Sequence, residues 1–220
     1  SSTLSRNMKQ INRGLIVCGT DTDVGKTIVS SLLVQGLNAI YWKPIQSGIE
    51  NGTDTNRVCE LLDLSQDRWI PEVYKFQSAV SPHWAAEIDN QRINPSLLHL
   101  PRVSNPLIIE TAGGLMVPLN REFLQIDQLQ SWGLDILLVA RSGLGTLNHT
   151  LLSIEALRKR NINIFGLILN GPLHKDNPKT LEEFGDVPII AQLPILKSIN
   201  SHTLADEWAK QNLGFHFNMK

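Results

Sequence analysis

Six short apolar runs, each followed by a stretch with helical spacing, organise the chain. The runs span residues 14–19, 39–45, 107–110, 135–140, 164–169 and 188–193. The predicted helices span residues 26–37, 54–62, 82–88, 124–132, 148–160, 178–184 and 203–211. Strands that are buried on both faces read as continuous apolar runs rather than as alternating ones. This order therefore predicts βαβ units that form a parallel sheet with helices on both faces.

The chain shows neither an internal repeat nor a linker that would divide it, so we predict one domain over residues 14–220 and a polar tail over residues 1–13. The tail has no apolar centre, so we expect no secretory signal. No apolar run approaches the ~20 residues of a membrane span. Residues 64–104 are broken by prolines, and we predict only that they complete the fold.

Composition and charge narrow the possible partners. The net charge is −1, and no Lys/Arg block is present. This balance argues against nucleic acid and membrane surfaces and favours small-molecule ligands. Cys18 and Cys59 have neither metal-ligand nor redox spacing, so we expect free thiols in a reducing cytoplasm.

The ligands of open α/β sheets bind beyond the carboxyl ends of the strands, and the first strand end carries a phosphate-binding sequence. The stretch GTDTDVGKT, residues 19–27, ends in Gly-Lys-Thr where a helix begins. Backbone N–H groups and the helix dipole attract phosphate there. We predict that Lys26 reaches the outer phosphates of a nucleotide and that Thr27 binds Mg²⁺. The fold class is thus α/β, a single-domain P-loop NTPase-like parallel sheet with helices on both faces.

This loop departs from the usual pattern in two places. Thr20 stands where the first glycine is expected, and residues 21–23 read Asp-Thr-Asp where partition-type ATPases have a second lysine and paired glycines. The missing lysine counts against a motor or switch ATPase.

The second strand end carries a lysine. In the run WKPIQSG, Lys43 leaves an apolar strand, and Ser47 adds a hydroxyl four residues later. Because a desolvated lysine is costly unless it meets an anion, we predict that Lys43 faces a substrate anion or the transferred phosphoryl group. The alternative is a surface lysine whose ammonium reaches solvent.

Two carboxylates are candidates for holding Mg²⁺ beside the Thr27 hydroxyl. Glu110 ends the run LIIE and precedes the turn TAGG, so the strand carries it to the ligand-binding edge. Asp54 lies in the loop GTDTN ahead of a helix. Mg²⁺ commonly takes one or two carboxylates together with phosphate oxygens. For Asp54, the alternative is a helix cap.

A second glycine-rich turn follows the strand at residues 135–140. Free N–H groups of Thr146, Leu147 and Asn148 would hold a carboxylate there, although a purely structural turn is the alternative. Asn170 and Gly171 lie after another strand, where an amide can read a purine edge. The chain lacks the Asn-Lys-x-Asp stretch of guanine sites, which favours ATP.

Taken together, these motifs resemble the dethiobiotin synthetase family. The resemblance rests on the order and spacing of GTDTDVGKT, WKPIQSG, the Asp54 loop, IIETAGG, the GTLNH turn and LNG, and it covers roughly residues 15–194. It implies an ATP- and Mg²⁺-dependent closure of the ureido ring of dethiobiotin from 7,8-diaminononanoate and CO₂. The amine would form a carbamate, the carbamate would attack the γ-phosphate, and the second amine would displace phosphate.

The resemblance also implies roles for individual residues. Thr27, Asp54 and Glu110 would hold Mg²⁺, and Lys26 and Lys43 would stabilise the carbamate and the developing phosphoryl charge as the catalytic pair. The implied substrate contacts are Thr22, Ser47, Thr146, Leu147 and Asn148, the last three binding the substrate carboxylate across a homodimer interface. The implied nucleotide site comprises Asp23, Val24, Gly25, Lys26, Thr27, Ile28, Asp54, Glu110, Thr111, Ala112, Gly113, Asn170, Gly171, Leu193, Pro194 and Ile195.

Two positions depart from the family pattern. Asp23 stands where glutamate is frequent, and Thr111 stands where glycine is frequent. The shorter Asp23 reaches less far, and Thr111 adds bulk beside Glu110. A partition or switch ATPase that controls dimerisation remains the alternative from a different functional class.

Overall fold

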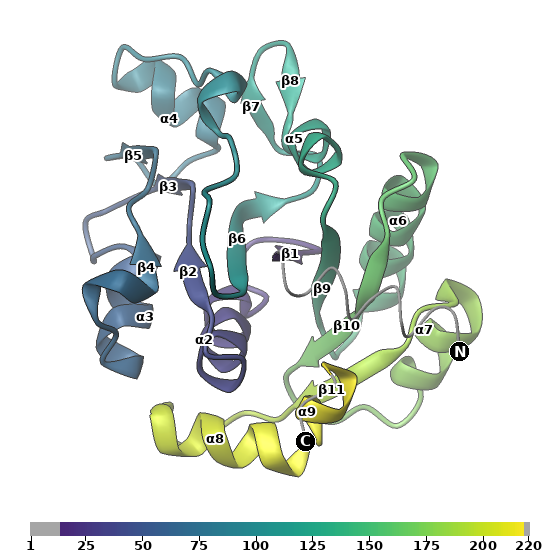
Figure 1. Cartoon of the computed structure of the whole chain (residues 1–220). Coiled ribbons are helices and arrows are strands. Elements are labelled where there is room, and N and C mark those ends of the chain that lie inside the picture. The colour runs from purple at the N-terminus through teal and green to yellow at the C-terminus, as the bar shows by residue number, and fades with distance from the viewer. Residues whose placement is uncertain (1–13, 218–220) are drawn as a thin grey trace.

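The central element of the fold is a seven-stranded sheet (Figure 1). A computed structural model describes residues 14–217 of the chain. The strand order is β11–β10–β9–β1–β6–β2–β4, and every pair is parallel. The strands are β1 (Leu15–Gly19), β2 (Ile40–Trp42), β4 (Trp69–Ile70), β6 (Leu107–Gly114), β9 (Asp135–Arg141), β10 (Ile164–Asn170) and β11 (Ile189–Leu193). The predicted α/β fold with a parallel sheet is confirmed, whereas the predicted tail at 1–13 lies outside the described residues.

Helices alternate with the strands along the chain. They are α2 (Lys26–Gly36), α3 (Asp54–Leu62), α4 (Pro82–Ile88), α5 (Gln125–Trp132), α6 (Thr146–Lys159), α7 (Asn177–Gly185), α8 (Ser201–Lys210) and α9 (Leu213–His216), with 3₁₀ turns η1 (Gln66–Arg68) and η2 (Pro95–Leu97). Helices α3 and α4 have the predicted bounds. Helix α6 begins two residues before the predicted start, because Gly145 takes the left-handed conformation at its N-cap, with φ 95°.

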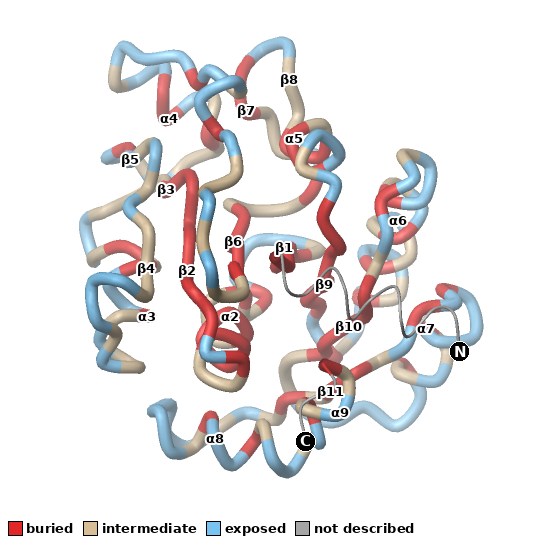
Figure 2. Tube along the Cα trace, viewed as in Figure 1, coloured by how far each residue is buried: buried red, intermediate tan, exposed pale blue. Residues whose placement is uncertain are grey.

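Two hydrophobic clusters cover opposite faces of the sheet. Within β1, Leu15 and Val17 belong to a cluster with residues of α2, α3 and α8, whereas Ile16 and Cys18 belong to one with residues of α5, α6 and α7. Alternate side chains of a strand point to opposite faces, so this division places helices on both faces as predicted. The central strands are buried along most of their length (Figure 2). Such burial explains why they read as continuous apolar runs.

The predicted strand at residues 39–45 is wrong in one respect, because it is two strands. Strand β2 ends at Trp42, and β3 (Ile45–Ser47) pairs in parallel with β5 (Tyr74–Phe76) in a separate small sheet. The break falls at Lys43 and Pro44. Proline has no N–H to donate to the ladder, so the chain leaves the central sheet there. A third sheet joins β7 (Pro118–Asn120) to β8 (Phe123–Leu124).

The segment 64–104 supports the loop that carries Ser47. Besides the β3–β5 pairing, the N–H of Gly48 donates to the carbonyl of Phe76 at 3.0 Å. Gly48 has φ 81°, and a Cβ there would lie 2.7 Å from the Cβ of Ala79. The segment therefore fixes the backbone of this loop, a role that sequence patterns did not predict.

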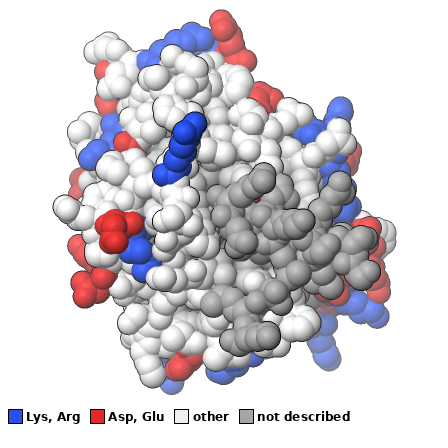
Figure 3. Space-filling view, viewed as in Figure 1, with Lys and Arg blue, Asp and Glu red and all other residues white. Residues whose placement is uncertain are grey.

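The surface agrees with the balanced composition. On the face shown in Figure 3, side chains of both charges are scattered and separated by uncharged surface. Among the described residues, no helix is both long and apolar enough to cross a bilayer. Cys18 and Cys59 are both free thiols, as predicted.

Candidate active site

The phosphate-binding loop joins the buried strand β1 to the N-terminus of α2. Gly25, the N-cap residue, has φ 103°, a conformation that favours glycine. The ammonium of Lys26 curls back and donates to the carbonyl of Asp21 at 3.0 Å. A Cβ on Gly19 would lie 2.7 Å from that carbonyl oxygen and 3.1 Å from the ammonium nitrogen. The loop thus closes around Lys26, and the helix N-terminus faces outward as an anion site.

Asn170, at the carboxyl end of β10, holds the same loop from the other side. Its Nδ2 donates to the carbonyl of Val24 at 3.0 Å. Sequence reasoning predicted that this amide reads a purine edge; the observed bond instead ties β10 to the phosphate loop. The nucleotide contact of Asn170 therefore remains a prediction, whereas its contact with the loop is established.

Replacing Gly25 by alanine is expected to weaken ADP binding by about tenfold or more, because strain and the broken loop contact act together. A Cβ at Gly25 would lie 2.1 Å from Nδ2 of Asn170, so the amide must leave Val24. Calorimetric titration with ADP measures the loss.

Gly133→Ala is the matched control for this substitution. Gly133 also has positive φ, 66°, but a Cβ there meets nothing within 4 Å. Equal weakening in both variants would assign the effect to a general loss of stability and contradict the predicted role of the Gly25–Asn170 contact.

Lys43 lies between two carboxylates. Its Nζ is 2.7 Å from Oδ2 of Asp54 and 3.0 Å from Oε2 of Glu110. The residue is only 4% exposed, so the alternative of a lysine that reaches solvent is wrong. The break between β2 and β3 places it, because Lys43 is the first residue after β2 leaves the sheet beside β6.

Asp54 is not the cap of α3. Thr53 is the N-cap, and its hydroxyl accepts from the N–H of Asn56 at 3.0 Å. The carboxylate of Asp54 is free to pair with Lys43 and, at 2.7 Å, with Arg57. The N–H of Asp54 donates to Oε1 of Gln46 at 3.0 Å, which joins α3 to the Ser47 loop. The cap alternative is therefore wrong.

Glu110 is the centre of this network and is 1% exposed. The Thr27 hydroxyl donates to its Oε2 at 3.0 Å, the oxygen that Lys43 also contacts. The Tyr41 hydroxyl donates to Oε1 at 3.0 Å. Residues from β2 and just after it, from the middle of β6, and from the starts of α2 and α3 thus meet at one point. The prediction that Glu110 ends its strand is wrong, because β6 continues beside β1 as far as Gly114.

Burial and charge set the protonation states of the network. Burial lowers the pKa of Lys43, but the carboxylates of Glu110 and Asp54 outweigh it, and the pKa is raised. Burial raises the pKa of Asp54, yet Lys43 and then Arg57 bring it below the usual value. Burial, followed by Glu110, raises the pKa of Tyr41 well above its usual value, so the phenol remains a hydrogen-bond donor. Burial, followed by the charge of Lys43, lowers the pKa of Lys26.

The donor set fits a hard divalent cation. Within residues 14–217, no group of three or more His, Cys, Asp or Glu gathers in metal-binding geometry. Two carboxylates and a hydroxyl do converge here, and Mg²⁺ commonly takes one or two carboxylates and completes its shell with phosphate oxygens and water. The Lys43 ammonium, itself a cation, already lies between the two carboxylates.

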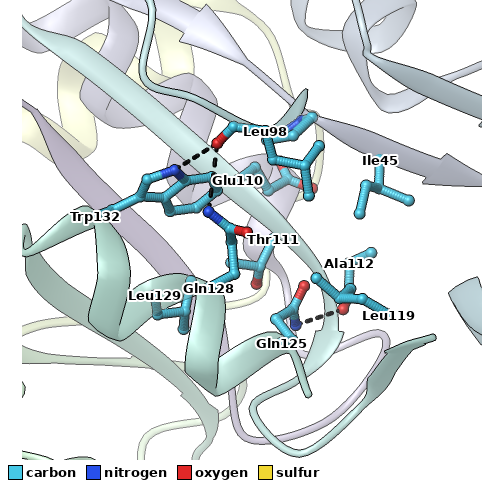
Figure 4. Close-up of a pocket in the computed structure, with 11 residues that line it drawn as sticks. Ile45, Leu98, Glu110, Thr111, Ala112, Leu119, Gln125, Gln128, Leu129 and Trp132 are labelled. Atoms are coloured by element: carbon cyan, nitrogen blue, oxygen red, sulfur yellow. Dashed lines mark hydrogen bonds between the residues drawn. The ribbon is translucent and has the colours of Figure 1, made fainter. Parts of the chain in front are cut away.

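The end of β6, beyond Glu110, is held by Gln125, the first residue of α5. Its Nε2 donates to the carbonyl of Ala112 at 2.7 Å (Figure 4). It also donates to the carbonyl of Gly114 at 2.7 Å. Gly113, between them, has φ 65°, and its ideal Cβ lies 4.0 Å from the Thr22 hydroxyl. The end of β6 therefore approaches the phosphate loop at Thr22, which is a predicted substrate contact.

Thr111 follows Glu110 within β6, and its hydroxyl donates to the carbonyl of Val17 at 3.4 Å. The side chain therefore points into the sheet. Any nucleotide contact of Thr111 would come from its backbone.

The aspartates of the phosphate loop face Arg141 and solvent. Asp21 accepts from its neighbour's N–H, that of Thr22, at 2.7 Å and pairs with Arg141 at 3.4 Å, while Arg141 also donates to the carbonyl of Thr22 at 3.0 Å. The backbone bond, then Arg141, lowers the pKa of Asp21, with burial opposing them. Asp23 is exposed with φ 56°. The Asp21 carboxylate is thus neutralised at the outer rim of the loop.

The second predicted anion site lies at the N-terminus of α6. The N–H of Thr146 donates to the carbonyl of Gly143 at 3.2 Å, so it is not free as predicted. The Thr146 hydroxyl shares a hydrogen with that of Thr150 at 3.0 Å. No backbone acceptor is recorded among the described residues for Leu147 and Asn148. The predicted carboxylate site is thus reduced to the N–H groups of Leu147 and Asn148.

The other predicted residues surround this core. The Ser47 hydroxyl is buried and has no hydrogen-bond partner among residues 14–217. The N–H of Gly171 donates to the carbonyl of Leu193 at 3.0 Å. Ile195 is 75% exposed beyond that turn. Their nucleotide contacts remain predictions.

Comparison with known proteins assigns the family. A family model described as an AAA domain matches residues 13–203. An ATP-dependent dethiobiotin synthetase from Rhodopseudomonas palustris (strain BisB18) is 46% identical over 190 residues, covering 86% of this chain and 91% of the relative. The chain belongs to the dethiobiotin synthetase family. A second member, from Brucella melitensis biotype 2, is 42% identical over 200 residues, 91% of this chain and 94% of the relative.

A solved structure shows that the fold extends beyond dethiobiotin synthetases. A ParA family ATPase from Chlorobium tepidum is 14% identical, with a TM-score of 0.56, and the match covers 89% of this chain and 97% of that one. At this identity the likeness shows a common fold alone. The partition or switch alternative therefore gains nothing from it, and the predicted family is confirmed.

Three residues of this site were missed by sequence reasoning. Tyr41 lies inside an apolar strand and is indistinguishable there from a core aromatic residue. Gln125 donates to the carbonyls of Ala112 and Gly114 at the end of β6, and Arg141 donates to the carbonyl of Thr22 in the phosphate loop. Each bond joins residues that are at least 11 positions apart along the chain. Their position at a strand or helix end is the one signal that could have drawn attention to them.

Proposed function

We propose that this chain is an ATP- and Mg²⁺-dependent dethiobiotin synthetase that closes a ureido ring on 7,8-diaminononanoate with CO₂ and releases ADP and phosphate. The supporting observation is the cluster of Lys43, Asp54 and Glu110 beside the phosphate loop, in a chain of this family. A carbamate that attacks a phosphate is an anion approaching an anion. Fixed cations must offset that repulsion, and the site supplies them.

Two lysines divide the electrostatic work in this proposal. Lys26, at the start of α2, neutralises the β- and γ-phosphates together with the helix N-terminus. Lys43 contacts the same Glu110 oxygen as Thr27, and in this proposal it stabilises the carbamate and the charge developing on the transferred phosphoryl group. Thr27, Asp54 and Glu110 would hold Mg²⁺, which supplies further charge neutralisation on the phosphate oxygens when bound.

The diamine lies, in this proposal, between the phosphate loop and the Ser47 loop. Thr22 and the unpartnered hydroxyl of Ser47 orient the diamine, and the backbone at Gly113, close to Thr22, bounds its site. The substrate carboxylate binds at the N–H groups of Leu147 and Asn148 with Thr146 beside them, on the partner of a homodimer. Leu144, next to that turn, is fully exposed in the single chain, which is consistent with a covering partner. Light scattering on the intact protein would give a monomer mass if the dimer is wrong.

The nucleotide, in this proposal, extends along residues 23–28 towards Asn170, Gly171 and the turn at residues 193–195. Its base lies near that turn. The cytoplasm is the proposed compartment because Cys18 and Cys59 are free thiols.

Labelled bicarbonate provides the direct test. The protein is incubated with ATP, Mg²⁺, 7,8-diaminononanoate and ¹³C-bicarbonate, and the product is analysed by mass spectrometry. We expect dethiobiotin carrying one ¹³C, and ADP release that requires both the diamine and bicarbonate. Hydrolysis of ATP at the same rate without the diamine would contradict the proposal and favour a switch ATPase.

A further inference from the structure

The hydroxyl of Tyr41 is a polar group of the site to which the proposed function gives no role. Tyr41 is 0% exposed, and its ring belongs to the cluster that packs strands β1, β2 and β6 against α2 and α3. Packing alone would be satisfied by phenylalanine. A buried hydroxyl costs free energy unless it is hydrogen-bonded, and the partner of this one is Oε1 of Glu110.

The two oxygens of Glu110 have different partners. Oε1 accepts from Tyr41, whereas Oε2 accepts from Thr27 and Lys43, each at 3.0 Å. The terminal torsion of glutamate is broad, so packing fixes the carboxylate plane only weakly. Without a donor on Oε1, the carboxylate is free to turn both oxygens towards the Lys43 ammonium. The Tyr41 bond opposes that rotation and keeps one oxygen on the Thr27 side.

We propose that Tyr41 is a positioning residue for the metal site, because its hydroxyl fixes Glu110 so that Oε2 remains directed at the position shared by Thr27 and Mg²⁺. This inference rests on the proposed function, since it takes Glu110 as a metal ligand. Groups that hold a ligand's second atom orient the ligand and commonly change metal affinity when removed. Tyr41 itself touches neither metal nor substrate.

Tyr41→Phe removes one hydroxyl and keeps the ring. We expect the apparent Mg²⁺ constant for dethiobiotin formation to rise about tenfold or more, while the KM for ATP at saturating Mg²⁺ is unchanged. Direct binding of Mn²⁺ to the ADP-bound protein, followed by electron paramagnetic resonance, should weaken by a similar factor. This second readout requires no turnover.

The chain offers a matched control in its other tyrosine. The hydroxyl of Tyr74 accepts from the N–H of Asn94 at 3.0 Å, in the small sheet away from Glu110. Tyr74→Phe therefore removes the same atom and one hydrogen bond but should leave Mg²⁺ and Mn²⁺ constants unchanged. Equal Mg²⁺ constants in wild type and Tyr41→Phe, or the same loss in both variants, would overturn the inference.

A measurement on Tyr41 itself covers the case in which Tyr41→Phe does not fold. Tyr74→Phe labelled with 3-fluorotyrosine carries its only fluorine at position 41. Its ¹⁹F resonance should move when Mg²⁺ is added to the ADP-bound protein, because the metal polarises Glu110. A resonance that responds to ADP but not to Mg²⁺ would overturn the inference. Failure of the proposed function would appear separately, as wild-type protein that makes no labelled dethiobiotin.

Discussion

Lys43→Ala is expected to reduce dethiobiotin formation by about 10³-fold or more, because the lysine stabilises charge that develops only during phosphoryl transfer. The KM for ATP should change by less than about threefold, because the phosphate loop, and not Lys43, binds ATP before the reaction. Lys43 lies among Asp54 and Glu110, on the opposite side of Glu110 from Tyr41. Steady-state kinetics at saturating Mg²⁺ measures both constants.

The variant must be compared as folded protein, because the substitution also has a cost in stability. Removing Lys43 leaves the buried carboxylate of Glu110 without its cation, whereas Asp54 keeps Arg57. Breaking a buried ion pair destabilises by about 3–5 kcal/mol. Assays at a temperature where circular dichroism shows native protein separate the two effects. Lys75→Ala, at an exposed lysine of β5, is the control and should match wild type. Loss of ATP affinity equal to the loss of turnover would place Lys43 in the nucleotide site instead.

The fold and the ligand-binding edge follow from local patterns. Near-continuous apolar runs marked the central strands, and a polar or charged residue after each run marked the strand end. Lys43 and Glu110 could be selected in this way, although β6 continues past Glu110 to Gly114. Thr27 was selected from its Gly-Lys-Thr sequence. Apolar runs do not encode strand order, however, and these residues meet only because β2, β6 and β1 are neighbours in the sheet. The resemblance to a family supplied that proximity before the geometry did.

The errors have a common physical origin in long-range contacts. The single strand at residues 39–45 was wrong because Pro44 divides the run and β5, 27 residues or more downstream, provides a second pairing partner for β3. Asp54 was left open as a cap because nothing local shows that Thr53 caps α3. Thr146 was expected to offer a free N–H to the substrate carboxylate, but this N–H donates to the carbonyl of Gly143. In each case, a competing hydrogen bond decided the outcome.

Tyr41 and Gln125 illustrate what a single sequence hides. Each residue acts through one hydrogen-bonding group. Tyr41 donates to Glu110, and Gln125 donates to the backbone of β6 beyond Glu110. Neither Tyr41 nor Gln125 belongs to a recognisable sequence motif. Only the partner atoms, on a different strand or helix, distinguish them from ordinary core or helix-start residues.

Glu110→Gln tests the centre of the network and is expected to lower turnover by about 10³-fold, because metal-borne and lysine-borne stabilisation are lost together. The amide keeps the size of the side chain, and its oxygen can still accept from Tyr41. If its NH₂ group faces the Thr27 hydroxyl and the Lys43 ammonium, both lose Glu110 Oε2 as an acceptor, and Lys43 keeps only Asp54. Mn²⁺ binding to the ADP-bound variant should weaken in parallel, which distinguishes this change from Lys43→Ala.

The same substitution should lower the free energy of unfolding by about 3 kcal/mol at pH 7, the lower end for a broken buried pair because Asp54 still faces Lys43. The pKa of Lys43 is raised in the fold, so its charge stabilises the protein below the unfolded value of about 10.4 and loses that effect as the pH rises through the folded value. Urea unfolding at pH 7 therefore reports the full contribution.

Glu87→Gln makes the same change at an exposed pair with Arg121 and should leave the free energy of unfolding close to that of wild type. A Glu110→Gln protein as stable as this control would show that Asp54 alone compensates Lys43. Glu110 would then serve the metal site and not the fold, and the loss of turnover would have to appear entirely as a changed dependence on Mg²⁺.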